Sequence, residues 1–292
     1  MSWRTVIISE QSKLDYRLGY LVVRGIETKK VLIDEIKVLV IENPAISLTG
    51  CLIEALTEKK VKVIFCDSKR NPVSELVPHH GCHDCSAKIR IQIDWDEAIK
   101  ASIWQEIISE KIRKQAGLLK RANKLKEAEL LNSYIGQVEL YDTTNREGHA
   151  AKVYFNALFG MDFSRSADNA INAALNYGYS ILLSAFNREI AANGYLTQLG
   201  LFHSNMYNPF NLACDMMEPY RVLVDQIVYY DQPKTFDKDA KHQMWSLLDE
   251  TVVIDGTRQS LSNAIKIYSR SIFDAINERD AAYIRHYTLP NV

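Results

Sequence analysis

The chain has 292 residues, a length typical of about two domains. Its 35 lysines and arginines balance 36 aspartates and glutamates, so the net charge of −1 excludes a protein that coats nucleic acid through bulk charge, although a local basic surface is still possible. No apolar run reaches the ~18 residues that span a bilayer, the N-terminus lacks the pattern of a signal peptide, and five cysteines are few for this length. We therefore expect a reduced, cytoplasmic protein that does not bind membranes.

Residues 1–77 are predicted to form a β-sandwich-like domain. Short runs rich in valine, isoleucine and leucine recur there, and such spacing is typical of a sheet or sandwich. The predicted strands are Thr5–Ser9, Tyr20–Arg24, Lys30–Ile33, Lys37–Ile41 and Val61–Cys66. Ser47 is expected to cap a helix between the last two strands, because Leu52 and Leu56 follow it at helical spacing.

Residues 78–94 are predicted to be a linker, and residues 95–292 a larger all-α domain, so the expected fold class is α+β. Prolines, histidines and a glycine interrupt any periodicity in the linker, whereas the helical pattern then continues almost to the end. Long helices are expected at Asn169–Ala192 and from about Ser260 to Arg279. A hairpin turned by Asp255 and Gly256 should precede the last helix.

The predicted linker contains a CxxC pattern with neighbouring histidines. His79, Cys82, His83 and Cys85 are all residue types that bind zinc. The second pair of ligands that zinc fingers carry at a larger spacing is absent. A flexible linker with exposed thiols is therefore the favoured interpretation, and a compact zinc site is the alternative.

Two segments of the helical region contain candidate catalytic or metal-binding groups. Glu147 falls in the first turn of a helix that Thr144 or Asn145 can cap, where the helix dipole by itself favours an acid. His203 follows a stretch that is punctuated by glycines, and it could be a ligand, an acid–base group or a hydrogen-bonded core histidine. The residues alone leave these alternatives open.

A third segment places Asp215 and Glu218 three residues apart, which brings their side chains to one face of a helix. Two such carboxylates repel each other, and a hard cation such as Mg²⁺ or Mn²⁺ would relieve the repulsion. Pro219 has no N–H for the carbonyl of Asp215, so a helix must bend or begin there. Alternatively, Arg221 pairs with Glu218 and Asp225 on a solvated face.

The stretch from 111 to 126 is basic and contains no acidic residue. Its cations are Lys111, Arg113, Lys114, Lys120, Arg121, Lys124 and Lys126. A solvated helix face usually mixes both signs of charge, so binding to a DNA backbone is as plausible here as an exposed face. The phosphate-loop, dinucleotide-binding and nucleophile-elbow motifs are absent from the chain.

Taken together, these segments resemble the CRISPR-associated spacer-acquisition integrases, in their type II-A form. The resemblance covers nearly the whole chain. It rests on the order and spacing of Trp3–Val6, Val63–Asp67, Asn145–Phe155, Asn172–Tyr179, Gly200–His203 and Asp215–Arg221.

The resemblance implies a dimer-forming N-terminal β domain and a helical catalytic domain. It also implies that Glu147, His203 and Glu218 bind a catalytic Mg²⁺ or Mn²⁺ ion, with Asp215 as a further acid beside the metal. Lys111, Arg113, Lys114, Lys120, Arg121 and Lys124, together with Arg146 and Arg221, form the predicted DNA-binding set.

The implied reaction is a transesterification in which the 3′-hydroxyl of a prespacer DNA attacks a phosphodiester of the CRISPR repeat. The implied partners are DNA, a second copy of the chain, and a small ferredoxin-like acquisition protein in a heterohexamer. For type II-A systems, the resemblance also implies a ring-shaped DNA-end-binding protein and the effector nuclease as partners. The alternatives are a metal-dependent nuclease that never joins strands and an architectural DNA-binding subunit.

Overall fold

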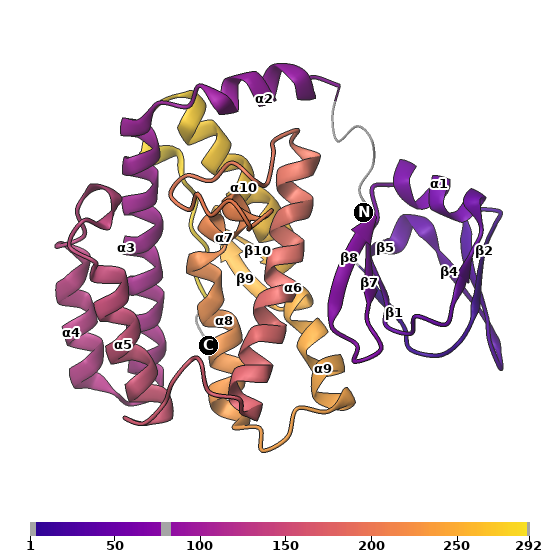
Figure 1. Ribbon diagram of the computed structural model, residues 1–292, viewed down its shortest axis with the longest axis horizontal. Helices are drawn as coiled ribbons and strands as arrows, with labels where there is room; N and C mark the ends of the chain where they lie inside the picture. Colours follow the sequence, from indigo (N-terminus) through magenta and orange to yellow (C-terminus); the bar gives the residue numbers. More distant parts are fainter. Residues whose placement is uncertain (1–3, 77–82, 291–292) are drawn as a thin grey trace. The chain divides into compact units, whose positions relative to one another are not determined.

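The computed structural model describes residues 4–76 and 83–290, and the chain divides into two compact units, Met1–Gly81 and Cys82–Val292 (Figure 1). The first unit is rich in strands and the second is largely helical. The predicted α+β class, with a sandwich-like β region preceding a helical domain, is confirmed.

The N-terminal unit contains two four-stranded sheets. The first has the order β1 (Arg4–Ile8), β5 (Ile36–Ile41), β7 (Lys62–Cys66) and β8 (Pro72–Leu76), with β1, β5 and β7 parallel and β8 antiparallel to β7. The second has the order β4 (Thr28–Leu32), β3 (Tyr20–Arg24), β2 (Lys13–Arg17) and β6 (Ser47–Leu48). The helix α1 (Gly50–Glu58) connects the two sheets.

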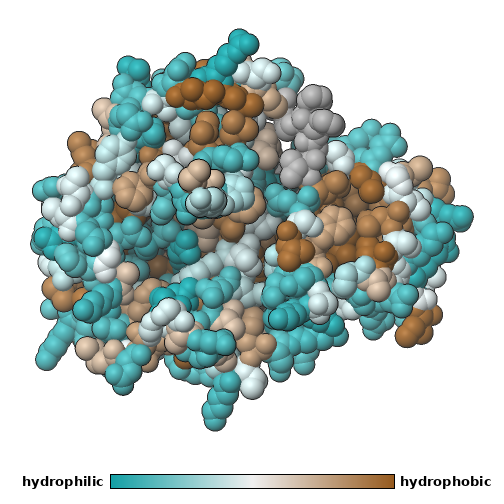
Figure 2. All heavy atoms as spheres, in the orientation of Figure 1, coloured by the Kyte–Doolittle hydropathy of each residue, from teal (hydrophilic) through white to brown (hydrophobic). Residues whose placement is uncertain are grey.

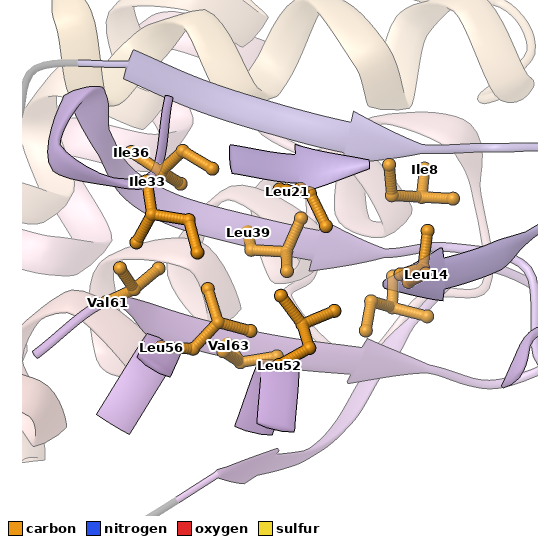
Figure 3. Close-up of a cluster of buried hydrophobic side chains, with 11 residues drawn as sticks. Ile8, Leu14, Leu21, Ile33, Ile36, Leu39, Leu52, Leu56, Val61 and Val63 are labelled. Atoms are coloured by element: carbon orange, nitrogen blue, oxygen red, sulfur yellow. The ribbon is translucent and has the colours of Figure 1, made fainter. Parts of the chain in front are cut away.

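The core of this unit forms from side chains of both sheets and of α1 (Figure 3). Leu14, Leu39 and Leu52, which come from these three elements, are fully buried. Each such leucine stabilises the fold by about 1.5–3 kcal/mol. The helix begins after Thr49 and not after the predicted cap Ser47, which lies in β6.

The helical unit contains nine α-helices, several 3-10 helices and one hairpin in the residues that the structure describes. Its α-helices are α2 (Cys85–Ile93), α3 (Glu97–Arg121), α4 (Leu125–Ile135), α5 (Arg146–Phe159), α6 (Ala170–Ala192), α7 (Asn211–Met216), α8 (Arg221–Asp231), α9 (Lys238–Trp245) and α10 (Leu261–Asn277). A 3-10 helix, Glu218–Tyr220, lies between α7 and α8. The hairpin pairs β9 (Thr251–Ile254) with β10 (Thr257–Ser260).

Local sequence signals explain several of these boundaries. Asn169 caps α6 by accepting a hydrogen bond from the Asn172 N–H, and Ser260 caps α10 in the same way. Asp255 and Gly256 both have positive φ, as a two-residue hairpin turn requires. The predicted helices and hairpin of this region are therefore confirmed.

Helix α3 supplies much of the core of the helical unit. Trp104, Ile107, Ile108 and Ile112 are fully buried on one of its faces, as the apolar spacing predicts. By contrast, α2 occupies the second half of the segment that was expected to be a linker. Within the described ranges, no helix has the length and apolarity needed to cross a membrane.

Candidate functional site

Glu147 lies in the first turn of α5, where an unusual local backbone fixes its position. The cap residue Asn145 has a φ of 51° and accepts a hydrogen bond from the Gly148 N–H. The buried Asp142 carboxylate accepts the N–H groups of Arg146 and Glu147 at 2.8 and 2.9 Å. Because Asp142 and Asn145 accept the N–H groups at the start of the helix, the Glu147 carboxylate is not needed as a helix cap.

Glu218 begins the 3-10 helix, next to Pro219. Helix α7 ends at Met216 and α8 begins at Arg221, so the helical path is broken where the proline predicts a break. The Glu218 side chain is buried, with 4% of its surface exposed. Its Oε1 accepts a hydrogen bond from Arg221 Nε at 2.8 Å. The Glu218–Arg221 pair is therefore formed, but it is buried and does not lie on a solvated face.

Lys111 of α3 joins the two glutamates. Its ammonium lies 2.5 Å from Glu147 Oε1 and 2.5 Å from Glu218 Oε2. Burial would raise the pKa of Glu218, but Lys111 and Arg221 outweigh burial and lower that pKa to about 2. For the same reason the pKa of Lys111 is raised although burial opposes its charge. Lys111 and Glu218 therefore form a buried ion pair, and the partly exposed Glu147 is the second partner of the ammonium.

His203 is held in place by Asp215, which is completely buried. The Asp215 carboxylate contacts His203 Nδ1 and accepts the N–H groups of Leu201, Phe202 and His203 at 2.7, 3.0 and 3.2 Å. The hydrogen bond to Asp215 raises the pKa of His203, and the charges of both glutamates add to this effect. The carboxylate thus fixes both the loop and the imidazole ring.

This arrangement changes the interpretation of Asp215 and Glu218. The two acids were expected to repel each other on one helix face, yet each has its own set of partners, so the expected repulsion is wrong. Asp215 satisfies the loop and His203, whereas Glu218 faces the two cations. In this structure Asp215 contacts His203, and its predicted place as a further acid beside the metal stays a prediction.

The loop can wrap around Asp215 only because residue 200 is glycine. A Cβ at Gly200 would lie 2.4 Å from the His203 carbonyl oxygen and 2.7 Å from Asp215 Oδ2. Both neighbours are fixed, since one is backbone and the other is a buried carboxylate. The ring of Trp104, from α3, then packs edge-on against His203 with the centroids 5.7 Å apart.

Glu147 and Glu218 line a pocket of about 230 Å³. Other lining residues include Lys111, Gln115, Arg165, Tyr179 and Arg221. The Arg165 and Arg221 guanidinium groups lie 5.4 and 4.7 Å from the centre of the Tyr179 ring. One side of the pocket is therefore acidic, and the remaining walls carry cations and an aromatic ring, a combination suited to a phosphate beside a metal ion.

Beneath this pocket, Asp225 is buried and accepts hydrogen bonds from Tyr154 and Tyr179 at 2.9 and 2.5 Å. Burial raises the pKa of Asp225 to about 6, although both tyrosines favour its charged form. Asp225 therefore anchors Tyr179, and it does not form the hydrogen bond with Arg221 that a solvated face would have provided.

A second cluster in the described part of the chain brings ligand-type atoms within 4.8 Å of one another: Glu106, Glu110 and His286. Glu110 is already paired with Arg113 and Lys114, and Glu106 with His286 Nε2 at 2.9 Å. Glu147, His203 and Glu218 are farther apart than this limit. Lys111 lies between the two glutamates of that set, in the position a shared cation would take.

The basic stretch does not form one continuous exposed surface. Lys111 is buried at the glutamates, and Lys114 contacts Glu110 and the Tyr287 carbonyl oxygen. Arg113, Lys120 and Arg121 are exposed, and Lys124 is half-buried. Arg146 lies over the Tyr134 ring at 5.4 Å. The cations of this stretch therefore lie on different sides of α3, some in buried pairs and some exposed, and DNA binding by them stays a prediction.

The possible zinc ligands His79 and Cys82 lie outside the described residues. His83 precedes α2, and Cys85 is its first residue. The zinc alternative stays a prediction.

The predicted metal ligands fit a divalent cation on two observations. Glu218 Oε2 is buried, and its partner among the described residues is the Lys111 ammonium, a cation that another cation could replace. Asp215 occupies His203 Nδ1, which leaves Nε2 as the ring nitrogen for a ligand. Two carboxylates and one imidazole are a donor set that suits Mn²⁺ and also accepts Mg²⁺.

The acid–histidine site lies in the helical unit, within the part of the chain that a known family model covers. The sequence matches the family described as CRISPR associated protein Cas1 over residues 5–238, and the chain belongs to this family. It is 37% identical over 231 residues to the CRISPR-associated endonuclease Cas1 of Neisseria meningitidis serogroup C (strain 8013), an alignment that covers 79% of this chain and 76% of the relative.

Solved structures share the fold. A casposase bound to integration product matches with a TM-score of 0.75 and 18% identity, over 96% of this chain and 92% of that chain. A chain of a Cas6-RT-Cas1–Cas2 complex matches with a TM-score of 0.73 and 17% identity, over 96% of this chain and 36% of that one. The type II-A subtype stays a prediction.

Proposed function

We propose that this protein is a metal-dependent DNA integrase of CRISPR adaptation, which joins the 3′-hydroxyl of a prespacer to a phosphodiester of the CRISPR repeat. The observation that carries the proposal is the Glu147–Lys111–Glu218 bridge at a cation-lined pocket, with His203 oriented by Asp215. The relative from Neisseria is named an endonuclease, and the related casposase is bound to an integration product.

Glu147, Glu218 and His203 Nε2 would hold a Mg²⁺ or Mn²⁺ ion. Such an ion stabilises charge on the phosphodiester oxygens and makes the attacking hydroxyl more acidic. Arg221 and Arg165, which line the same pocket, would hold the non-bridging phosphate oxygens through their guanidinium groups. Both guanidinium groups lie near the Tyr179 ring, which would help to hold them in place.

The reaction exchanges one phosphodiester for another. The 3′-hydroxyl of the prespacer loses its proton and forms a new P–O bond, while the P–O bond to the repeat 3′-oxygen breaks and that oxygen gains a proton. Because one phosphodiester bond replaces another, the reaction does not require ATP hydrolysis. The same site would act as a nuclease when water replaces the 3′-hydroxyl.

The test uses the purified full-length protein with its ferredoxin-like partner and Mn²⁺. Prespacers that end in either a 3′-hydroxyl or a 3′-deoxy nucleotide are mixed with a labelled leader–repeat duplex. We expect a branched product from the hydroxyl prespacer only. Cleavage without branching would favour the simple nuclease, and binding with neither product would favour the architectural subunit.

The proposed partners are DNA, a second copy of this chain and the small ferredoxin-like acquisition protein. The matched chain in the Cas6-RT-Cas1–Cas2 complex is bound in an assembly with Cas2. In the β unit, Leu18 and Ile26 are more than 90% exposed, and Figure 2 shows further hydrophobic side chains on the visible face of that unit. Such apolar surface is typical of an interface.

We therefore expect a homodimer in the absence of DNA and of any other protein, formed through the β unit. Replacing Leu18 and Ile26 together by serine should weaken it, because each change removes apolar area from the contact. Sedimentation velocity at micromolar concentration measures the effect. A wild-type protein that sediments as a monomer would contradict the dimer.

Three cations at and just beyond the C-terminal end of α3 are proposed to hold the DNA backbone. Replacing Lys120, Arg121 and Lys124 by alanine should weaken prespacer binding equally for all sequences. If each contacts one phosphate, the slope of log K against log salt should shrink by roughly 0.9 per contact, or about 2.7 in total. Fluorescence anisotropy between 50 and 200 mM salt measures the slope, and an unchanged slope would place the DNA elsewhere.

A further inference from the structure

The Glu147–Glu218 pair holds a cation supplied by the chain itself. Lys111 Nζ contacts one oxygen of each carboxylate at 2.5 Å, and Lys111 is only 8% exposed. A buried ammonium is stable only beside anions, so these two contacts explain why a lysine occurs on the apolar face of α3. The position between two carboxylates is also the position that a bound divalent ion would need.

The charges of this cluster balance without a metal ion. Glu147 and Glu218 carry two negative charges, and Lys111 and Arg221 carry two positive ones. A divalent cation added to this arrangement would leave the buried cluster with two excess positive charges. That state is costly in a low-dielectric site unless a cation leaves or an anion such as a phosphate arrives.

We infer that Lys111 is a resident counter-cation that must leave the Glu147–Glu218 pair before a divalent metal ion can bind there. The inference rests on the metal site of the proposed function. Among the described residues, the Lys111 ammonium is the partner of Glu218 Oε2, so a metal ion that binds this oxygen takes the place of that one contact.

The pocket gives the displaced ammonium somewhere to go. Lys111 lines the 230 Å³ pocket together with Arg165 and Arg221. The flexible four-carbon side chain of lysine allows its head group to swing from the carboxylates to a phosphate oxygen in that pocket, which the planar fork of an arginine could not do as readily. Metal ion and phosphate therefore bind together, and Lys111 is the positioning residue that couples them.

The test measures Mn²⁺ binding to the full-length, DNA-free protein by isothermal titration calorimetry and by the EPR signal of free Mn²⁺. The Lys111→Met variant should bind Mn²⁺ roughly tenfold more tightly than wild type, because the competing cation is gone. Lys100→Met is the matched control. Lys100 lies on the same helix and, within the described ranges, pairs with the exposed Glu97, so its loss should leave the Mn²⁺ affinity unchanged.

Thermal unfolding gives a second readout. Without metal, Lys111→Met should have a lower Tm than wild type, because the two carboxylates lose their shared cation. Saturating Mn²⁺ should raise the Tm of this variant by more than it raises that of wild type. If that variant fails to fold, Lys111→Arg replaces it. A guanidinium should hold the carboxylates bidentately, and Mn²⁺ should then bind more weakly than to wild type.

The outcomes separate this inference from the proposed function. One outcome would overturn the role of Lys111 but keep the metal site: Glu218→Gln abolishes Mn²⁺ binding, and Lys111→Met binds Mn²⁺ no more tightly than wild type. If Lys111→Met does not fold, equal or tighter Mn²⁺ binding to Lys111→Arg would overturn it as well. If Glu218→Gln binds Mn²⁺ as tightly as wild type, the proposed metal site is wrong, and both proposals lose their basis.

Discussion

Glu218→Gln is expected to reduce strand transfer by at least a hundredfold. Mutations of groups that merely support a metal ligand commonly cost 10–100-fold, so the loss of a ligand should cost more. The glutamine keeps the size of the side chain but removes the charge that faces Lys111 and Arg221. Branched-product formation with Mn²⁺ measures the effect, and transfer at the wild-type rate would contradict the role of Glu218.

The same variant should also be less stable, by about 3 kcal/mol, because breaking a buried ion pair leaves its partners without compensation. Glu189→Gln is the matched control. Glu189 is buried and its Oε1 lies 2.5 Å from Arg188, on α6 and outside the pocket. This control should lose stability and keep strand transfer, which separates the effect on the reaction from the effect on folding.

The pH dependence of stability follows from the lowered pKa of Glu218. Its carboxyl has a pKa of about 2 in the folded protein against 4.5 ordinarily. Its contribution to stability is therefore complete above about pH 4.5 and is lost as the pH falls toward about 2. Chemical unfolding of the metal-free protein between pH 7 and 3 should show this loss in wild type and a weaker one in Glu218→Gln.

Asp215→Asn is the second large expected effect. The carboxylate accepts three backbone N–H groups and contacts His203 Nδ1. An asparagine supplies a single acceptor oxygen and turns an N–H₂ group toward donors. Some of these buried donors then lose their partner, at about 1–3 kcal/mol each. We expect a lower Tm and a loss of strand transfer of about 10–100-fold, since the imidazole is no longer oriented.

Asp96→Asn provides the control for that change. Asp96 accepts backbone N–H groups of Ala98 and Ile99 at the start of α3, where asparagine caps a helix about as well as aspartate. Its Tm and strand transfer should match those of wild type. An Asp215→Asn protein that transfers strands as fast as this control would show that the loop does not depend on the charge.

Much of the architecture follows from local patterns in the sequence. The apolar stripe on α3 and the caps at Asn169 and Ser260 predict helices that the structure confirms. Strand β2 could not be found in this way, because its only fully buried side chain is Leu14 and charged residues surround it. Its pairing with β3 arises from contacts in the folded sheet, which a local sequence pattern does not show.

The site could be predicted only in part. The motifs point to Glu147, His203 and Glu218, but nothing local shows that Asp215 faces the loop of residues 201–203. A signal for Lys111 was present, since it follows Ile107 and Ile108 on the buried stripe. A cation in such a position indicates buried anions. The net charge of the basic stretch does not distinguish Lys111 from the exposed cations, because it ignores which face of the helix each residue occupies.

The most direct test of the central claim is anomalous X-ray diffraction from crystals of the full-length protein grown with Mn²⁺. The account predicts a manganese peak bound by Glu147, Glu218 and His203 Nε2, with the Lys111 ammonium moved away from the carboxylates. A peak at Glu106, Glu110 and His286 instead, or Lys111 still bridging the two glutamates at saturating Mn²⁺, would contradict it.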